Sequence, residues 1–75
     1  MTQEEAFQRL EQRIGEARQK HPTWQGSGPL YACQVIMGEA DELWKAVYSE
    51  SEARAVDEAL DVAATCIRFI MGEHK

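Results

Sequence analysis

The 75-residue sequence predicts an all-α fold: a short helix followed by a long antiparallel helical hairpin, which completes a four-helix-bundle core by dimerisation. Apolar residues recur every three or four positions along three segments, which is the period of a helix buried on one side. No segment alternates apolar and polar residues as a half-buried strand does. We therefore treat residues 1–75 as a single helical domain, with an N-terminal helix and loop over 1–28 and the hairpin over 29–72.

The first helix is expected to begin at Thr2, because Thr2 and Glu5 have the spacing of a capping box. Its apolar residues continue at helical spacing until about Lys20; they are Phe7, Leu10, Ile14 and Ala17. Residues 21–28 are rich in Gly, Pro and small polar residues, which predicts a loop.

The second helix is expected to start at Pro29, since the first helical position needs no N–H donor. Its inward-facing residues are predicted to be Cys33, Ile36, Ala40, Leu43 and Val47. Ser49 and Glu52 offer another capping box, so the turn to the third helix should be very short. The third helix is expected to run to about Met71 and to stop at Gly72. Its predicted inward-facing residues are Val56, Ala59, Leu60, Ala63, Ile67 and Ile70.

One hairpin and one flanking helix have too little surface to enclose their own apolar residues. Two hairpins packed together would form a four-helix bundle with a continuous core. We therefore expect a homo-oligomer, either a dimer or a dimer of dimers.

Charge and composition exclude several classes of protein. The net charge is −5 and the chain has no basic stripe, so a nucleic-acid partner is not expected. No stretch is apolar or long enough to span a membrane, and the polar, acidic N-terminus does not look like a targeting peptide. Cys33 and Cys66 lie among small and apolar residues, where buried reduced thiols are more usual than a disulfide. These features favour a cytoplasmic location for the protein.

Two pairs of acids stand out: Glu39 with Glu42, and Glu58 with Asp61. No other two of the 13 acids are three residues apart, the spacing that places side chains on one face of a helix. Both pairs border the predicted apolar stripe, where unmatched charge is costly. The alternative is ordinary solvated charge on amphipathic helices. We interpret the four acids as a cation site formed where the two helices of the hairpin face each other.

The ligand type selects the ion. Carboxylates without histidine or thiolate are hard oxygen donors, which suit Mg²⁺ first and Mn²⁺ second. His21 lies in the predicted loop and His74 near the end of the chain, and both are expected to be exposed rather than ligands.

The segments Gly38–Ala46 and Asp57–Val62, with the acid pairs inside them, resemble the MazG-like nucleotide pyrophosphatases of the all-α NTP pyrophosphatase superfamily. The shared pattern is Glu-x-x-Glu, a spacer, then Glu-x-x-Asp, with an aliphatic residue after each pair. The likeness covers residues 29–72. It implies Mg²⁺-dependent cleavage of a (d)NTP to a (d)NMP and pyrophosphate. It also implies that the four acids are both metal ligands and catalytic residues, with Glu39 orienting or deprotonating the attacking water.

The chain departs from the family in two ways. Gly38 stands where many relatives have a further glutamate, and larger relatives carry phosphate-binding groups on a later helix. Substitutes for those groups are predicted among Lys45, Arg54 and Arg68, or Arg18 and Lys20 of a neighbouring helix or subunit. Trp24, in the loop, is the candidate for a lid facing the base. The alternative interpretation makes these residues surface cations and a packing aromatic.

A rival hypothesis belongs to another class of function. The chain would be a non-catalytic dimeric helical binding module, and its acids would form a metal-stapled or electrostatic surface. Turnover of a nucleotide separates the two hypotheses, whereas stabilisation by Mg²⁺ does not, because a binding-only site also stabilises the fold.

Overall fold

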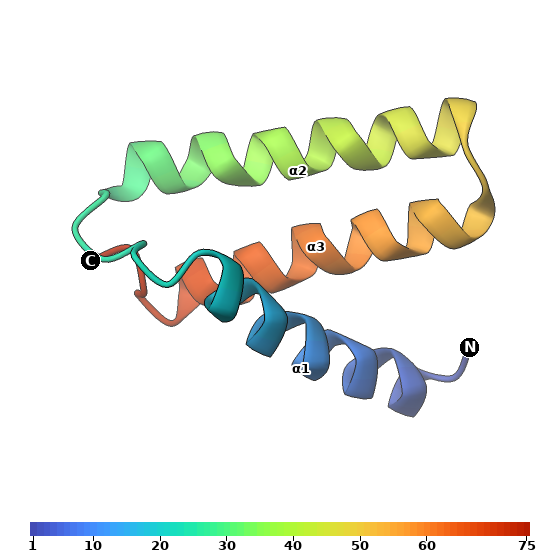
Figure 1. Ribbon diagram of the computed structural model, residues 1–75, viewed down its shortest axis with the longest axis horizontal. Helices are drawn as coiled ribbons and strands as arrows, with labels where there is room; N and C mark the ends of the chain where they lie inside the picture. Colours follow the sequence, from blue (N-terminus) through green and yellow to red (C-terminus); the bar gives the residue numbers. More distant parts are fainter.

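The computed structural model describes all residues, 1–75, and contains three helices and no strand. Helix α1 spans Gln3–Lys20, α2 spans Pro29–Ser49 and α3 spans Glu52–Ile70. Helices α2 and α3 lie side by side as an antiparallel hairpin, and α1 crosses α3 on the other side (Figure 1). The all-α fold and the three expected segments are therefore confirmed.

Local sequence signals explain most helix ends. Thr2 accepts a hydrogen bond from the Glu5 amide and Glu5 reaches back to the Thr2 amide, which completes the expected capping box. Pro29 occupies the first turn of α2 as predicted. Gly72, with φ of 79°, lets the chain turn after α3, and the Glu73 amide donates to the Arg68 carbonyl as in a Schellman motif.

The expected cap of α3 at Ser49 was wrong. Ser51 is the N-cap, and its hydroxyl accepts a hydrogen bond from the Arg54 amide. Ser49 instead ends α2, where its hydroxyl donates to the Lys45 carbonyl. The connection is therefore only Glu50 and Ser51 between the two helices. This short turn keeps α2 and α3 in one fixed alignment.

The core of the single chain is thin. Most of the buried apolar residues are small, and no large side chain is completely buried. The buried apolar residues are Trp24, Ala32, Ala46, Leu60 and Ala64. Alanines on the facing sides of α2 and α3 let the two helices approach closely.

The predicted inward stripes of α2 and α3 were partly wrong. On α3, Ala59 and Ile70 are exposed. Cys33, Ala40 and Val47 are exposed, and α2 turns Ala32 and Ala46 toward α3 instead. The physical reason is that α2 has apolar residues on two faces, and the hairpin covers only one of them. Cys33 was also expected to be a buried thiol, but it is an exposed one.

The loop between α1 and α2 is fixed to the end of the chain. The amides of Gly26 and Gly28 donate to the carbonyls of Lys75 and His74. His74 is buried and stacks on Phe69 with ring centroids 4.5 Å apart, so the expectation that it is exposed was wrong. None of the helices combines the length and the apolar character that crossing a membrane requires.

Candidate metal centre

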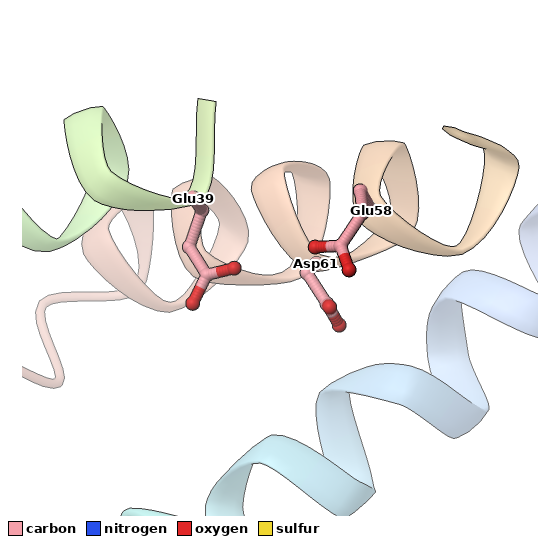
Figure 2. A group of neighbouring side chains, drawn as sticks. All are labelled: Glu39, Glu58 and Asp61. Atoms are coloured by element: carbon pink, nitrogen blue, oxygen red, sulfur yellow. The ribbon is translucent and has the colours of Figure 1, made fainter. Parts of the chain in front are cut away.

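Three of the four acids singled out in the sequence come together. One carboxylate oxygen from each of Glu39, Glu58 and Asp61 lies within 4.8 Å of the other two. Glu39 projects from α2, while Glu58 and Asp61 project from successive turns of α3 into the same space (Figure 2). The hairpin therefore brings together residues that are about 20 positions apart in the sequence.

Glu42, the fourth acid, is not part of this cluster. It is exposed on α2, and its nearest cation is Lys45, with Nζ 4.0 Å from Oε1. The periodicity of a helix explains the difference: Glu39 lies on the side of α2 that faces α3, and a step of three residues rotates Glu42 by about 60° away from that line.

The three carboxylates have different surroundings. Asp61 accepts a hydrogen bond from Arg13 of α1, with Nη1 2.6 Å from Oδ1. Glu58, which is only 7% exposed, is paired with Arg54 one turn earlier on α3. Glu39 has no cation within ion-pair distance. Burial raises the pKa of the Glu39 carboxyl, the charges of Asp61, Glu58 and, less, Glu42 raise this pKa further, and His21 lowers it slightly. The site therefore contains one carboxylate whose charge is not neutralised by a neighbour.

The oxygen atoms suit a small divalent cation. Ligand oxygens on one octahedral Mg²⁺ are about 3 Å apart when adjacent and about 4.2 Å apart when opposite, from a bond length of about 2.1 Å. The three oxygens lie within 4.8 Å of one another, which is wider than an opposite pair by up to about 0.6 Å and wider than an adjacent pair by up to about 1.8 Å. The carboxylates would therefore have to close in on a bound ion. Carboxylates alone are also the donor set that hard cations prefer.

Arg13 is the residue that sequence reasoning missed. Besides Asp61, it contacts both the backbone carbonyl and the carboxylate of Asp57, so that it joins α1 to α3 directly beside the carboxylate cluster. A signal for it existed in the sequence. Arg13 stands next to Ile14 and three residues after Leu10, so it borders the apolar stripe of α1 at helical spacing.

A cavity of about 440 Å³ lies next to the carboxylate cluster. It is formed by α1, the loop and the two helices of the hairpin, and both Glu39 and Asp61 line it. Arg13 and Lys20 bring positive charge to its wall from α1, and Tyr31 brings an aromatic ring from the first turn of α2. Glu16 also lines the cavity from α1 and pairs with Arg13, with Nε 3.4 Å from Oε2, so α1 brings two cations and one acid to the wall.

The residues named as substrate contacts from the sequence take several positions. Lys45 pairs with Asp41 on the exposed side of α2 and does not line the cavity. Arg54 is held between Glu50 and Glu58. Neither side chain extends toward the cavity in this arrangement.

Trp24 and Arg68 line the cavity but are used for packing. Arg68 is 5% exposed; it donates to the carbonyl of His21 and to the carboxylate of Glu73, and its guanidinium lies 4.9 Å from the centre of the Trp24 ring. Trp24 is 6% exposed and lines the cavity, where its ring also meets His74 edge to face. Arg18 also pairs with Glu73, and Lys20 has no carboxylate partner.

No family model, curated protein or solved structure matches this chain. Its function must therefore be argued from the carboxylate cluster and the cavity.

Proposed function

We propose that the protein is a Mg²⁺-dependent nucleoside triphosphate pyrophosphohydrolase, of the type that the MazG-like resemblance implies, acting in the cytoplasm. The observation that carries the proposal is the convergence of Glu39, Glu58 and Asp61 beside a cavity with positive charge on its wall. A cluster of carboxylates favours a cation, and a cavity with basic side chains favours an anion. A metal–nucleotide complex has both components.

The reaction consumes one water: NTP + H₂O gives NMP, pyrophosphate and a proton. The water oxygen forms a bond to the α-phosphorus, and the bond between that phosphorus and the α–β bridging oxygen breaks. A bound Mg²⁺ would neutralise the charge on the phosphate oxygens. Glu58 and Asp61 are the residues that would hold it, since α3 fixes both on one side of the cluster.

Glu39 is assigned the role of orienting the attacking water and accepting its proton. It is the member of the cluster without a cation partner, and its pKa is raised by burial and by the neighbouring acids. A carboxylate with a raised pKa is a stronger base. Glu42 is assigned no direct role in the single chain, because it lies outside the cluster.

We also propose that two chains pair through the exposed face of α2. The apolar side chains on that face follow the alternating spacing of three and four residues typical of a coiled-coil seam; they are Leu30, Cys33, Met37, Ala40, Trp44 and Val47. The thin core of the single chain supports the same proposal, because a second copy would cover apolar residues that the hairpin leaves exposed. A dimer of dimers would repeat this contact.

A second candidate function is the non-catalytic dimeric binding module. One observation favours it: Arg13 and Arg54 already neutralise Asp61 and Glu58 without a metal ion. The unpaired Glu39 and the adjoining cavity favour the enzyme, since a purely structural seam needs neither.

Pyrophosphate release from a panel of canonical and modified (d)NTPs, with and without Mg²⁺, tests the proposal. Asp61→Asn should abolish the release. Asp57→Asn is the matched control, because it makes the same chemical change next to the same Arg13 but outside the carboxylate cluster. Metal-dependent release that is lost only in Asp61→Asn supports the enzyme. A folded protein that releases nothing from any nucleotide contradicts it.

A further inference from the structure

Two cations of α1, Lys20 and Arg13, line the cavity beside the carboxylate cluster. Lys20 lines it and has no ion-pair partner. Arg13 lines it as well, and Arg13 is bound to Asp61, one of the acids assigned to the metal. Glu16 lies between them on α1 and pairs with Arg13, so two cations and one acid leave α1 with one excess positive charge at the cavity. A wall with excess positive charge that faces a carboxylate cluster favours an anionic ligand between them.

We propose that Arg13 and Lys20 of α1 hold the phosphate chain of the substrate in this cavity, and that Arg13 transfers from Asp61 to the phosphates when the cluster takes up its metal ion. This inference rests on the proposed function, and it supplies the phosphate-binding groups that the hairpin itself lacks.

The position of Arg13 supports such an exchange. Its guanidinium has five N–H donors and is planar, which suits phosphate oxygens as well as carboxylates. The carbonyl of Asp57, which accepts from the same Nη1 as Asp61, would keep Arg13 beside the cluster after Asp61 is released. The move needed is a rotation of one side chain, with α1 staying in place against α3.

The position of Lys20 supports the second contact. It is in the last turn of α1, seven residues from Arg13, and so about two helical turns or 10 Å further along the same face. Two long cationic side chains at this spacing on one face can contact different phosphates of one chain. Tyr31 on the neighbouring wall would then lie beyond the phosphates, where an aromatic ring can stack on a base.

The exchange makes opposite predictions for metal and nucleotide. In Arg13→Gln, Mn²⁺ alone should bind more tightly, because no cation competes for Asp61. The same variant should bind an α,β-methylene nucleoside triphosphate, which is not cleaved at that bond, at least about 10-fold more weakly, because a charged hydrogen bond is lost. If Arg13 only held α1 on α3, its substitution would weaken the binding of both Mn²⁺ and the analogue, or of neither.

Calorimetric titrations of the full chain test this, with Mn²⁺ alone and with the analogue in the presence of Mn²⁺. Lys20→Gln should leave binding of Mn²⁺ alone unchanged and weaken the analogue about 10-fold. Because Lys20 has no ion pair, this variant should fold normally even if Arg13→Gln loosens α1. Arg9→Gln, on the same helix but away from the cavity, is the matched control and should change neither affinity.

The two proposals fail in different ways. If the wild type releases no pyrophosphate and does not bind the analogue, the proposed function fails. If the wild type binds the analogue and cleaves nucleotides, but Arg13→Gln and Lys20→Gln bind the analogue like the wild type, only the assignment of Arg13 and Lys20 is overturned. Weaker Mn²⁺ binding in Arg13→Gln would overturn the exchange with Asp61.

Discussion

Replacing Glu39 with Gln should stabilise the metal-free protein. Glu39 is the carboxylate of the cluster that no cation neutralises, and burial together with Asp61 and Glu58 raises its pKa. A glutamine has nearly the same shape and carries no charge. The substitution therefore removes a repulsion without opening a cavity.

The magnitude follows from the geometry. Two unit charges 4.8 Å apart repel by about 0.9 kcal/mol in water and by about 3.5 kcal/mol at an effective dielectric constant of about 20. Arg13 and Arg54 cancel much of this repulsion, because each is paired with one of the two neighbouring acids. We expect a net stabilisation of about 1 kcal/mol, which raises the melting temperature by about 4–8 °C in a domain of this size.

The stability difference between Glu39→Gln and the wild type should also depend on pH, in a direction that can be checked. Because the pKa of Glu39 in the folded chain is above its ordinary value of 4.5, the folded state holds the proton more tightly than the unfolded state. The ionised Glu39 carboxylate therefore costs no stability well below pH 4.5, and this cost grows as pH rises through the raised pKa. The variant and the wild type should be equally stable at low pH and diverge toward neutral pH.

Thermal unfolding at fixed protein concentration in the presence of a chelator measures this difference. Glu42→Gln is the matched control: it makes the same change one turn along α2, outside the cluster. The charge of Glu42 raises the pKa of Glu39 less than those of Asp61 and Glu58 do, so this variant should alter stability by less than about 0.5 kcal/mol. A loss of stability in Glu39→Gln, or an equal gain in both variants, would refute the account of the cluster as a set of mutually repelling acids.

Three further predictions concern the rest of the molecule. Hydrogen bonds from Arg18 and Arg68 lower the pKa of Glu73. The ionised carboxylate therefore contributes stability that is present above the ordinary pKa of 4.5 and is lost as pH falls through the lowered pKa. In Glu73→Gln, the unfolding free energy should depend less on pH in this acidic range. Ser51→Ala removes the side-chain cap of α3 and should cost about 1 kcal/mol in denaturant unfolding, whereas Ser49→Ala should cost less, because Ser49 caps no helix start. Val47→Asp places a charge on the exposed apolar face of α2 and should yield monomers in sedimentation at concentrations where the wild type is a dimer or tetramer; a wild type that is itself monomeric would contradict the pairing proposal.

The helices could be predicted from the sequence because their signals are local. The Thr2–Glu5 capping box, Pro29 and Gly72 each depend on residues within one helical turn, and each has the predicted role. The cap of α3 was misplaced by two residues because Ser49 and Ser51 both suit an N-cap, and the length of the turn decides between them.

The site could be predicted only in part, because it depends on how the helices are rotated against each other. Periodicity placed Glu39 and Glu42 together at the border of the apolar stripe, but α2 has two apolar faces, and the choice of face brings Glu39 into the cluster and leaves Glu42 outside. Arg13 and the packing roles of Trp24 and Arg68 involve contacts across about 40 to 50 residues, which no local pattern specifies.

The measurement that tests the central claim most directly is Mn²⁺ binding by the folded protein, followed by electron paramagnetic resonance. The account predicts that the wild type binds Mn²⁺ at Glu58 and Asp61, beside Glu39, that Mg²⁺ displaces it, and that Glu58→Gln and Asp61→Asn lose the site while Asp57→Asn retains it. Equal Mn²⁺ binding in all four proteins, or none in the wild type, would contradict the account of these carboxylates as a metal centre.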